Sequence, residues 1–450
     1  MAIQLNSPRF SCSIEALDSV LPASLIDSSL NQHKVNTTRF RKLPAILTVW
    51  LVILLALFRF ESISNVLLRL VDSLGVILPW TRSESPVPAP CSSAIAQARK
   101  HIGWEVLKTI FEKLAQSLHL RFDKVSRWKG HFLCAFDGVG LRMPDTPDNH
   151  GEFGRPGSSR GKAAYPQMRC VALVAVFTHI MLSVTTGAFH VGELTLAYSL
   201  VSAVPMGSLV LMDRGFFAYG FLQSLINQGC FILVRAKTGK SALCFKKQKK
   251  LGSGDWLGVL KRPKKLKTGP EEIPVRIITY QIPGFRWVTL ITTLLDPEQY
   301  PAQEIIELYH SRWEIELCFD EIKTHLAAEP VPFRSMSAIL VRQEAYGLFI
   351  AFNIIRALMA TAAEEAGCEP RGLSFTGSLA AIRLAIQTMA RLEASQLPRE
   401  YKKLISRIGN HRLPERRERT NPREVKKLTS KFPCKKTRND QRKQTKRTAA

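Results

Sequence analysis

The apolar segments between residues 131 and 237 constrain the fold most. Segments of strand length come first, over 131–145 and 170–189, and strand, helix and strand then alternate up to residue 237. Such an order is typical of a mixed α/β sheet. Asp137, in CAFDGVG, and Asp213, in LVLMDRG, each follow an apolar run and precede a glycine or Arg-Gly. We therefore expect both aspartates at the carboxyl ends of strands, with a glycine turn and a second strand after Asp137.

The rest of the chain divides by composition. Two alternating segments, IPVRIITYQI and RWVTLITTLL, are joined by a PGF turn and predict a β-rich insertion instead of a further βαβ unit. The expected divisions are a polar arm (1–41), a helical N-terminal domain (42–125), the first part of the α/β core (126–237), the insertion (238–300), core helices (301–397) and a basic tail without apolar periodicity (398–450).

One long apolar segment raises the question of a membrane. Residues 43–58 carry no charge over sixteen positions, fewer than the ~20 needed to span a bilayer. We expect a buried helix that packs against the amphipathic segment 63–75, with a membrane anchor as the alternative. No signal peptide is expected, and the nine scattered cysteines form no CxxC pair, which favours reduced thiols in a cytoplasmic protein.

The charge balance points to a polyanionic partner. The net charge is +26, while 46% hydrophobic and 22% charged residues exclude wholesale disorder. Residues 401–450 hold 18 Lys or Arg against 4 Asp or Glu, a net +14, and residues 246–267 hold nine basic residues against Asp255. We expect nucleic acid to contact these two segments, and the helical N-terminal domain either to bind DNA or only to pack.

The two strand-end aspartates suit a metal site. Ligands usually bind at the carboxyl edge of an α/β sheet, and one or two carboxylates with waters and phosphates are the usual ligands of Mg²⁺. Asp137 and Asp213 therefore suit two-metal phosphoryl transfer. For each residue alone, the alternative is an ordinary turn or helix-cap aspartate.

A third segment adds polar residues at helical spacing. In ELYHSRWEIELCFDEIKTHL, Tyr309, Arg312, Glu316 and Lys323 stand at offsets 0, 3, 7 and 14, within about 60° of one another on a helix. The segment predicts one long helix over 301–326 whose polar stripe faces a site, or else a solvated face with an Arg312–Glu316 pair. The apolar side chains expected to pack on the sheet are Leu308, Ile315, Phe319 and Ile322.

These residues resemble a known family, the DDE transposases of bacterial insertion sequences in the insertion sequence 4 group. Tyr309, Arg312, Glu316 and Lys323 match its signature of Tyr, two residues, Arg, three residues, Glu, six residues and Lys. FDGVG and LMDRGF look like its two aspartate motifs, and the similarity covers residues 42–435. The resemblance implies a ribonuclease H-like mixed-sheet catalytic core with a β-rich insertion, preceded by a helical N-terminal domain.

The resemblance also implies a chemistry. Asp137, Asp213 and Glu316 would form the catalytic triad and bind two Mg²⁺ ions, or Mn²⁺. One metal would activate a water that attacks the phosphorus at a transposon end, and the other would stabilise the leaving 3′ oxygen. The freed 3′-hydroxyl would then attack the opposite strand or the target DNA.

Four further residues would bind DNA in this family. Tyr309, Arg312 and Lys323 would hold phosphates, and Trp287 in the insertion would stack on a base flipped out beside the cut end. For Trp287 the alternative is a tryptophan in the core of a strand.

The sequence leaves rival functions open. We expect a cut-and-paste transposase that binds double-stranded DNA at terminal inverted repeats and at the target, acts as a homodimer in a synaptic complex, and works in the cytoplasm at the nucleoid. The alternatives are a related nuclease, an inactive transposase relic, or a non-catalytic basic nucleic-acid-binding protein.

Overall fold

The computed structural model describes residues 19–36, 43–74, 89–158, 161–237, 239, 242–282, 285–328, 331–389 and 392–414. Most of the basic tail, from residue 415 on, lies outside the described residues.

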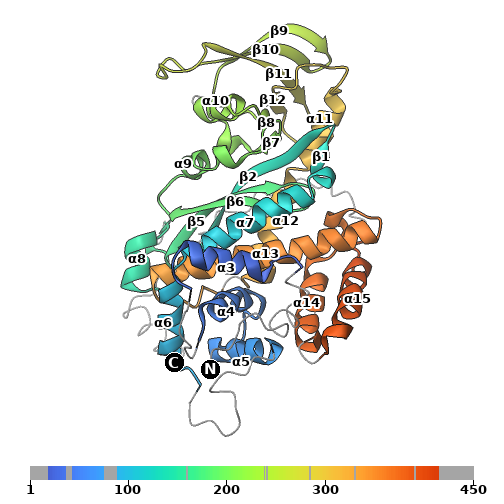
Figure 1. The fold of residues 1–450 in the computed structure, drawn as a ribbon. Helices are drawn as coiled ribbons and strands as arrows, with labels where there is room; N and C mark the ends of the chain where they lie inside the picture. Colours follow the sequence, from blue (N-terminus) through green and yellow to red (C-terminus); the bar gives the residue numbers. More distant parts are fainter. Residues whose placement is uncertain are drawn as a thin grey trace, which may run out of the picture.

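One twisted mixed sheet forms the centre of the molecule (Figure 1). Its neighbouring strands β2, β7 and β8 run parallel, and the other pairs are antiparallel. Its first five strands have the order and directions of a ribonuclease H-like core, so the α/β prediction is confirmed. The order is β6 (Met181–Ala188), β5 (Gln167–Ala175), β2 (His131–Arg142), β7 (Leu209–Met212), β8 (Phe231–Arg235), β12 (Val288–Thr292), β11 (Glu272–Tyr280), β10 (Asp255–Lys261) and β9 (Phe245–Gly252), and β1 (Arg127–Trp128) pairs with β2.

The β-rich segment after residue 238 continues this same sheet. β12 pairs with β8, and β11, β10 and β9 follow outward. Figure 1 shows β9–β11 at the end of the molecule farthest from the N-terminal helices. The small β3 (Gly157–Ser158) and β4 (Gly161–Lys162) form a separate pair.

The segment 131–145 differs from its prediction. The expected turn after Asp137 is absent, because β2 runs unbroken from His131 to Arg142 and pairs with β5 along Cys134 to Arg142. The glycines after Asp137 are therefore strand residues. At Gly138 an added Cβ would lie 2.6 Å from the carboxyl carbon of Glu193 in α9 (Glu193–Tyr198), so the Glu193 side chain would have to move.

Helices cover both faces of the sheet. α10 (Tyr219–Asn227) and α9 share one hydrophobic cluster with one face, and α7 (Glu105–Arg121) and α13 (Ala338–Glu365) share a second cluster with the other. The remaining N-terminal helices join the second cluster, so the helical N-terminal region and the core share one hydrophobic interior. Those helices are α3 (Ala23–Gln32), α4 (Ala45–Leu57), α5 (Ile63–Leu74) and α6 (Ser92–Ile102), with α8 (Pro147–Phe153) near the start of α13.

The apolar segment 43–58 forms the buried helix that was expected. Every residue of α4 is buried, and α4 packs against α13 and α5. α13 is itself long and apolar enough to cross a membrane, yet its apolar stretch is wholly buried inside the protein. Both helices therefore serve as core helices, since protein covers their apolar surface.

The start of the predicted basic tail is instead a helix. α15 (Leu397–Asn410) packs against α13 and α14 (Phe375–Met389) and buries Leu404, Ile405 and Ile408. These apolar residues stand at positions i, i+1 and i+4, which lie on one face of a helix. The high density of Lys and Arg hid that pattern in the sequence.

Candidate active site

Two parallel strands bring Asp137 and Asp213 to the same edge of the sheet. β2 and β7 pair from Leu133 with Leu209 to Ala135 with Leu211. Continuing that register sets Asp137 beside Asp213, the residue that directly follows β7. Beyond this point β2 is paired only with β5. Asp137 therefore lies in the middle of its own strand but next to the end of the parallel pairing with β7.

Each aspartate accepts a backbone N–H. The Asp137 Oδ1 accepts from Gly138 N at 2.8 Å, and the Asp213 Oδ1 accepts from Gly215 N at 2.7 Å and caps a short 3₁₀ turn. The cap role that was considered for Asp213 is therefore present. A carboxylate with one accepted bond still has free lone pairs for a ligand.

Burial governs the ionisation of Asp137. The pKa of the Asp137 carboxyl is raised to about 6, chiefly by burial. The N–H of Gly138 and the Arg312 guanidinium oppose the rise, and the negative charges of Asp213 and Glu193 add to it. Two partly buried carboxylates repel each other, and a bound cation stabilises their ionised forms. This pair therefore fits a metal ion.

The third segment is broken, where one long helix was expected. α11 (Ala302–His310) ends before Ser311, α12 (Trp313–Asp320) follows, and Glu321–Leu326 continues as a π-helix. The predicted apolar arc is confirmed, since all four of its side chains are buried: Leu308, Ile315, Phe319 and Ile322. π-helical turns are rare and frequently occur at functional sites.

Arg312 links the three acidic residues. Its Nη2 lies 3.0 Å from the Glu316 Oε1. Burial lowers the pKa of the Arg312 guanidinium, but the nearby Tyr309, Glu316 and Asp213 raise it above its usual value. Arg312 also acts on the carboxyl of Asp137. The positive charge of Arg312 therefore lies among Asp137, Asp213 and Glu316. Within the described ranges, no three carboxylate, imidazole or thiol groups are close enough together to hold one metal ion.

Tyr309 is buried at the end of β7. Its hydroxyl donates to the Met212 carbonyl at 3.2 Å, and burial raises the pKa of the phenol to about 12. Tyr309 thereby ties α11 to the residue before Asp213.

Lys323 and Trp287 are the two remaining residues of the expected site. Burial raises the pKa of the Cys170 thiol, and the nearby positive charge of Lys323, in the π-helix, opposes that rise. Cys170 pairs with Val139 on β2, so Lys323 lies near the strand that carries Asp137. Trp287 precedes β12 and is 63% exposed, so the strand-core alternative is wrong. β12 runs antiparallel to β8, which sets Trp287 beyond the carboxyl end of β8.

Two charged residues near the site did not emerge from the sequence. β7 and β8 pair up to Met212 with Val234, so Arg235 stands in register with Asp213. Glu193 lies over Gly138 and acts on Asp137. An apolar strand ending in Arg, as in FILVR, was the available signal for Arg235, whereas nothing in the sequence marks Glu193.

A ribonuclease H-like sheet with paired aspartates at its carboxyl edge defines a class, the enzymes that cut and join nucleic-acid strands. Comparisons with known proteins narrow it. The family model described as "Transposase DDE domain" matches residues 128–354, and "Insertion element 4 transposase N-terminal" matches residues 11–112. The chain belongs to the insertion sequence 4 family of DDE transposases.

Two relatives by sequence agree with this family. The chain is 32% identical over 427 residues to "Transposase InsG for insertion sequence element IS4" of Escherichia coli (strain K12), covering 93% of each chain. It is 30% identical over 211 residues to "Putative transposase InsZ" of the same organism, covering 47% of this chain and 67% of that one. A solved piggyBac transposase synaptic complex with hairpin DNA aligns over 91% of this chain and 87% of that one, with a TM-score of 0.41 and 10% identity.

Proposed function

We propose that this transposase cleaves and joins DNA strands at the ends of an insertion sequence through Asp137, Asp213 and Glu316. The observation that carries the proposal is the register of β2 and β7, which holds two carboxylates side by side at the edge of the sheet. Arg312 joins the third acid, Glu316, to this pair. The non-catalytic alternative gives no reason for a half-buried Asp137 whose ionisation costs free energy.

The triad would hold two divalent cations, Mg²⁺ or Mn²⁺. Bound there, the metals would supply an acidified water and a counter-charge for the leaving 3′ oxygen. Asp137 and Asp213 would bind them from the sheet, in positions fixed by backbone pairing. Glu316 has to exchange its ion pair with Arg312 for a metal, and Arg312 is then released to face a DNA phosphate.

The cationic side chains would orient the scissile strand. Arg312 offers a planar fork that can hold two phosphate oxygens at once, and Lys323 offers a point charge. Tyr309 would have to exchange its bond to the Met212 carbonyl for one to a phosphate. Trp287 has the exposure needed to stack on a flipped base.

Outside the site, two basic segments would hold DNA without reading its sequence. The lysines of β9 are exposed, and Lys247 and Lys250 lie 5.3 and 5.9 Å from the ring centre of Trp256. The outer face of α15 carries Arg399, Lys402 and Lys403 and leads into the basic tail. Each chain contributes one triad, so a homodimer would be needed to cut the two inverted-repeat ends in one complex on the nucleoid.

The proposal is tested by separating DNA binding from cleavage. Asp213→Ala is expected to abolish Mg²⁺-dependent nicking of a labelled inverted-repeat end and to leave end binding within about threefold, because the carboxylate contacts the metal and not the DNA. Asp72→Ala, at an exposed position of α5, is the matched control and should nick at the normal rate. Unchanged nicking by Asp213→Ala would exclude the triad, and the absence of nicking by the unaltered protein would favour a relic.

A further inference from the structure

A second polar cluster lies behind the helix that carries Glu316. Arg356 of α13 and His179, in the turn between β5 and β6, are 1% and 2% exposed. An Arg356 Nη2 contacts the His179 Nδ1 and lies 3.1 Å from the Glu321 Oε2. The His179 Nε2 is 3.3 Å from the Glu314 Oε2, and its Nδ1 is 3.4 Å from the Glu321 Oε2.

These contacts hold α12 and the π-helix from the side away from the site. Glu314 and Glu321 are seven residues apart and share one face, whereas Glu316 projects ~160° away from Glu314. The cluster therefore fixes how α12 is rotated about its axis, and that rotation decides where the Glu316 carboxylate points.

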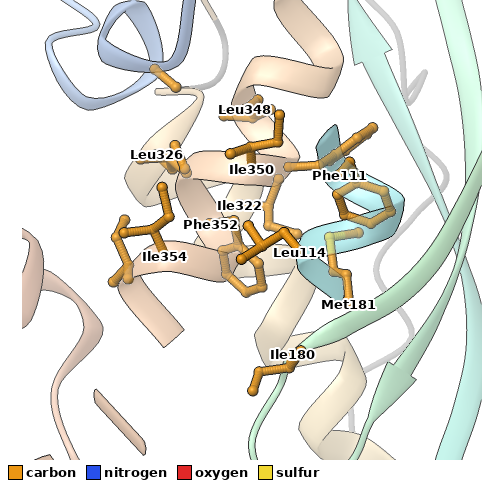
Figure 2. Packing of buried hydrophobic residues seen from close by; sticks show 14 of the residues in the cluster. Phe111, Leu114, Ile180, Met181, Ile322, Leu326, Leu348, Ile350, Phe352 and Ile354 are labelled. Atoms are coloured by element: carbon orange, nitrogen blue, oxygen red, sulfur yellow. The ribbon is translucent and has the colours of Figure 1, made fainter. Parts of the chain in front are cut away.

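The elements that carry the cluster are hydrogen-bonded to each other. One turn earlier in α13, Asn353 accepts from Met181 N and donates to Met181 O, both at 2.9 Å, which fixes the start of β6 against α13. Apolar packing continues around it: Figure 2 shows Ile322 and Leu326 of the π-helix among Leu348, Ile350 and Phe352 of α13.

His179 adopts a backbone conformation that a non-glycine residue rarely takes. Its φ is +59°, a region that costs free energy for residues with a Cβ. The turn keeps this conformation while the His179 ring is buried between the two glutamates and Arg356. Hydrophobic packing alone does not need four ionisable groups at this place, and burying them is costly unless they are paired.

We infer that Arg356 is a positioning residue for catalysis: with His179 it holds Glu314 and Glu321 and thereby orients Glu316 toward Asp137 and Asp213. The inference rests on the proposed function of the triad. Burial lowers the pKa of Arg356 to about 9, so the guanidinium stays charged at neutral pH.

The test removes the buried Arg356–Glu321 ion pair as a unit, so that neither of its two charges is left without the other. The double variant Arg356→Met with Glu321→Gln is compared with Arg276→Met with Asp255→Asn, which removes another buried pair, 2.6 Å apart, on β10 and β11. Mn²⁺ binding to the DNA-free proteins is measured by electron paramagnetic resonance, and end nicking is measured at saturating DNA.

We expect the Mn²⁺ dissociation constant of the Arg356 double variant to rise about tenfold, its nicking rate to fall at least tenfold, and its end binding to stay within twofold. The control pair should change thermal stability but leave Mn²⁺ binding unaltered. Should the double variant not fold, Arg356→Lys keeps the charge but loses the fork, and it should show the same two effects in weaker form.

Unaltered Mn²⁺ binding and nicking in a folded Arg356 variant would overturn the inference and leave the triad untouched. Equal Mn²⁺ losses in both double variants would also overturn it, because loss of stability would then be the cause. If the unaltered protein neither binds Mn²⁺ nor nicks DNA, the proposed function fails instead.

Discussion

Asp137 and Asp213 lie side by side because the parallel strands β2 and β7 are paired in register up to Ala135 with Leu211, two residues before the aspartates. Backbone hydrogen bonds set this relationship, so it does not depend on a bound metal. Glu316 differs in this respect, since its helix is placed by side-chain packing and by the cluster around Arg356.

The raised pKa of Asp137 predicts a conflict between stability and function. An unfolded aspartate ionises near 3.8, while the folded carboxyl ionises near 6, so the ionised form opposes folding above that pH and the effect disappears below pH ~4. Asp137→Asn should stabilise the metal-free protein by about 1–3 kcal/mol at pH 8 and by less than about 1 kcal/mol at pH 4. Urea denaturation at the two pH values measures this, and a loss of stability at pH 8 would contradict it.

Arg312 is predicted to oppose metal binding before DNA arrives. Removing its charge in Arg312→Met frees Glu316 and should tighten Mn²⁺ binding to the DNA-free protein about tenfold. The same change should slow nicking by a factor of about 100 or more, because a phosphate donor is lost. Arg312→Lys is the matched variant, and it should keep normal Mn²⁺ affinity while losing part of the rate. Weaker Mn²⁺ binding by the Met variant would count against this role.

Trp287 is predicted to act on DNA and not on folding. Its side chain is 63% exposed, so Trp287→Ala should leave the free energy of unfolding within about 0.5 kcal/mol. Stacking on a base is worth about 1–3 kcal/mol, so the complex with a cut end should weaken by a corresponding factor, and Trp287→Phe should restore most of it. Fluorescence of 2-aminopurine placed at the end reports the unstacked base, and identical signals for all three proteins would argue against flipping.

The basic tail is predicted to set the salt dependence of DNA binding. Residues 401–450 carry a net +14, most of it after Pro414. A chain ending at Pro414 should bind random duplex DNA with a log K versus log [salt] slope that is shallower by several units, because about 0.9 unit is lost for each phosphate contact. Nicking at saturating DNA should not change. A slope equal to that of the full chain would place the contacts elsewhere.

Local sequence patterns predicted the individual segments of the site better than the way in which these segments are connected and packed. Asp213 and the apolar arc from Leu308 to Ile322 follow from local patterns of period two and 3.6, and the structure has both. The glycines after Asp137 suggested a turn, yet pairing with β5 keeps them extended, and this depends on a strand about 30 residues away.

Other features depend on contacts too distant for a local pattern. The break before Arg312 carries no glycine or proline. The cluster behind Glu316 joins Arg356 to His179 across 177 residues of sequence and His179 to Glu321 across 142. Folding alone brings such groups together, so neither residue could be selected beforehand.

Asp137, Asp213 and Glu316 are proposed to hold the catalytic metals together. Anomalous scattering from crystals of the protein with a cut DNA end and Mn²⁺ tests this proposal directly. We expect two Mn²⁺ peaks bounded by these three carboxylates, with Arg312 turned from Glu316 toward a phosphate. Peaks bound by other residues, or a Glu316 still paired with Arg312 while Mn²⁺ occupies the site, would contradict it.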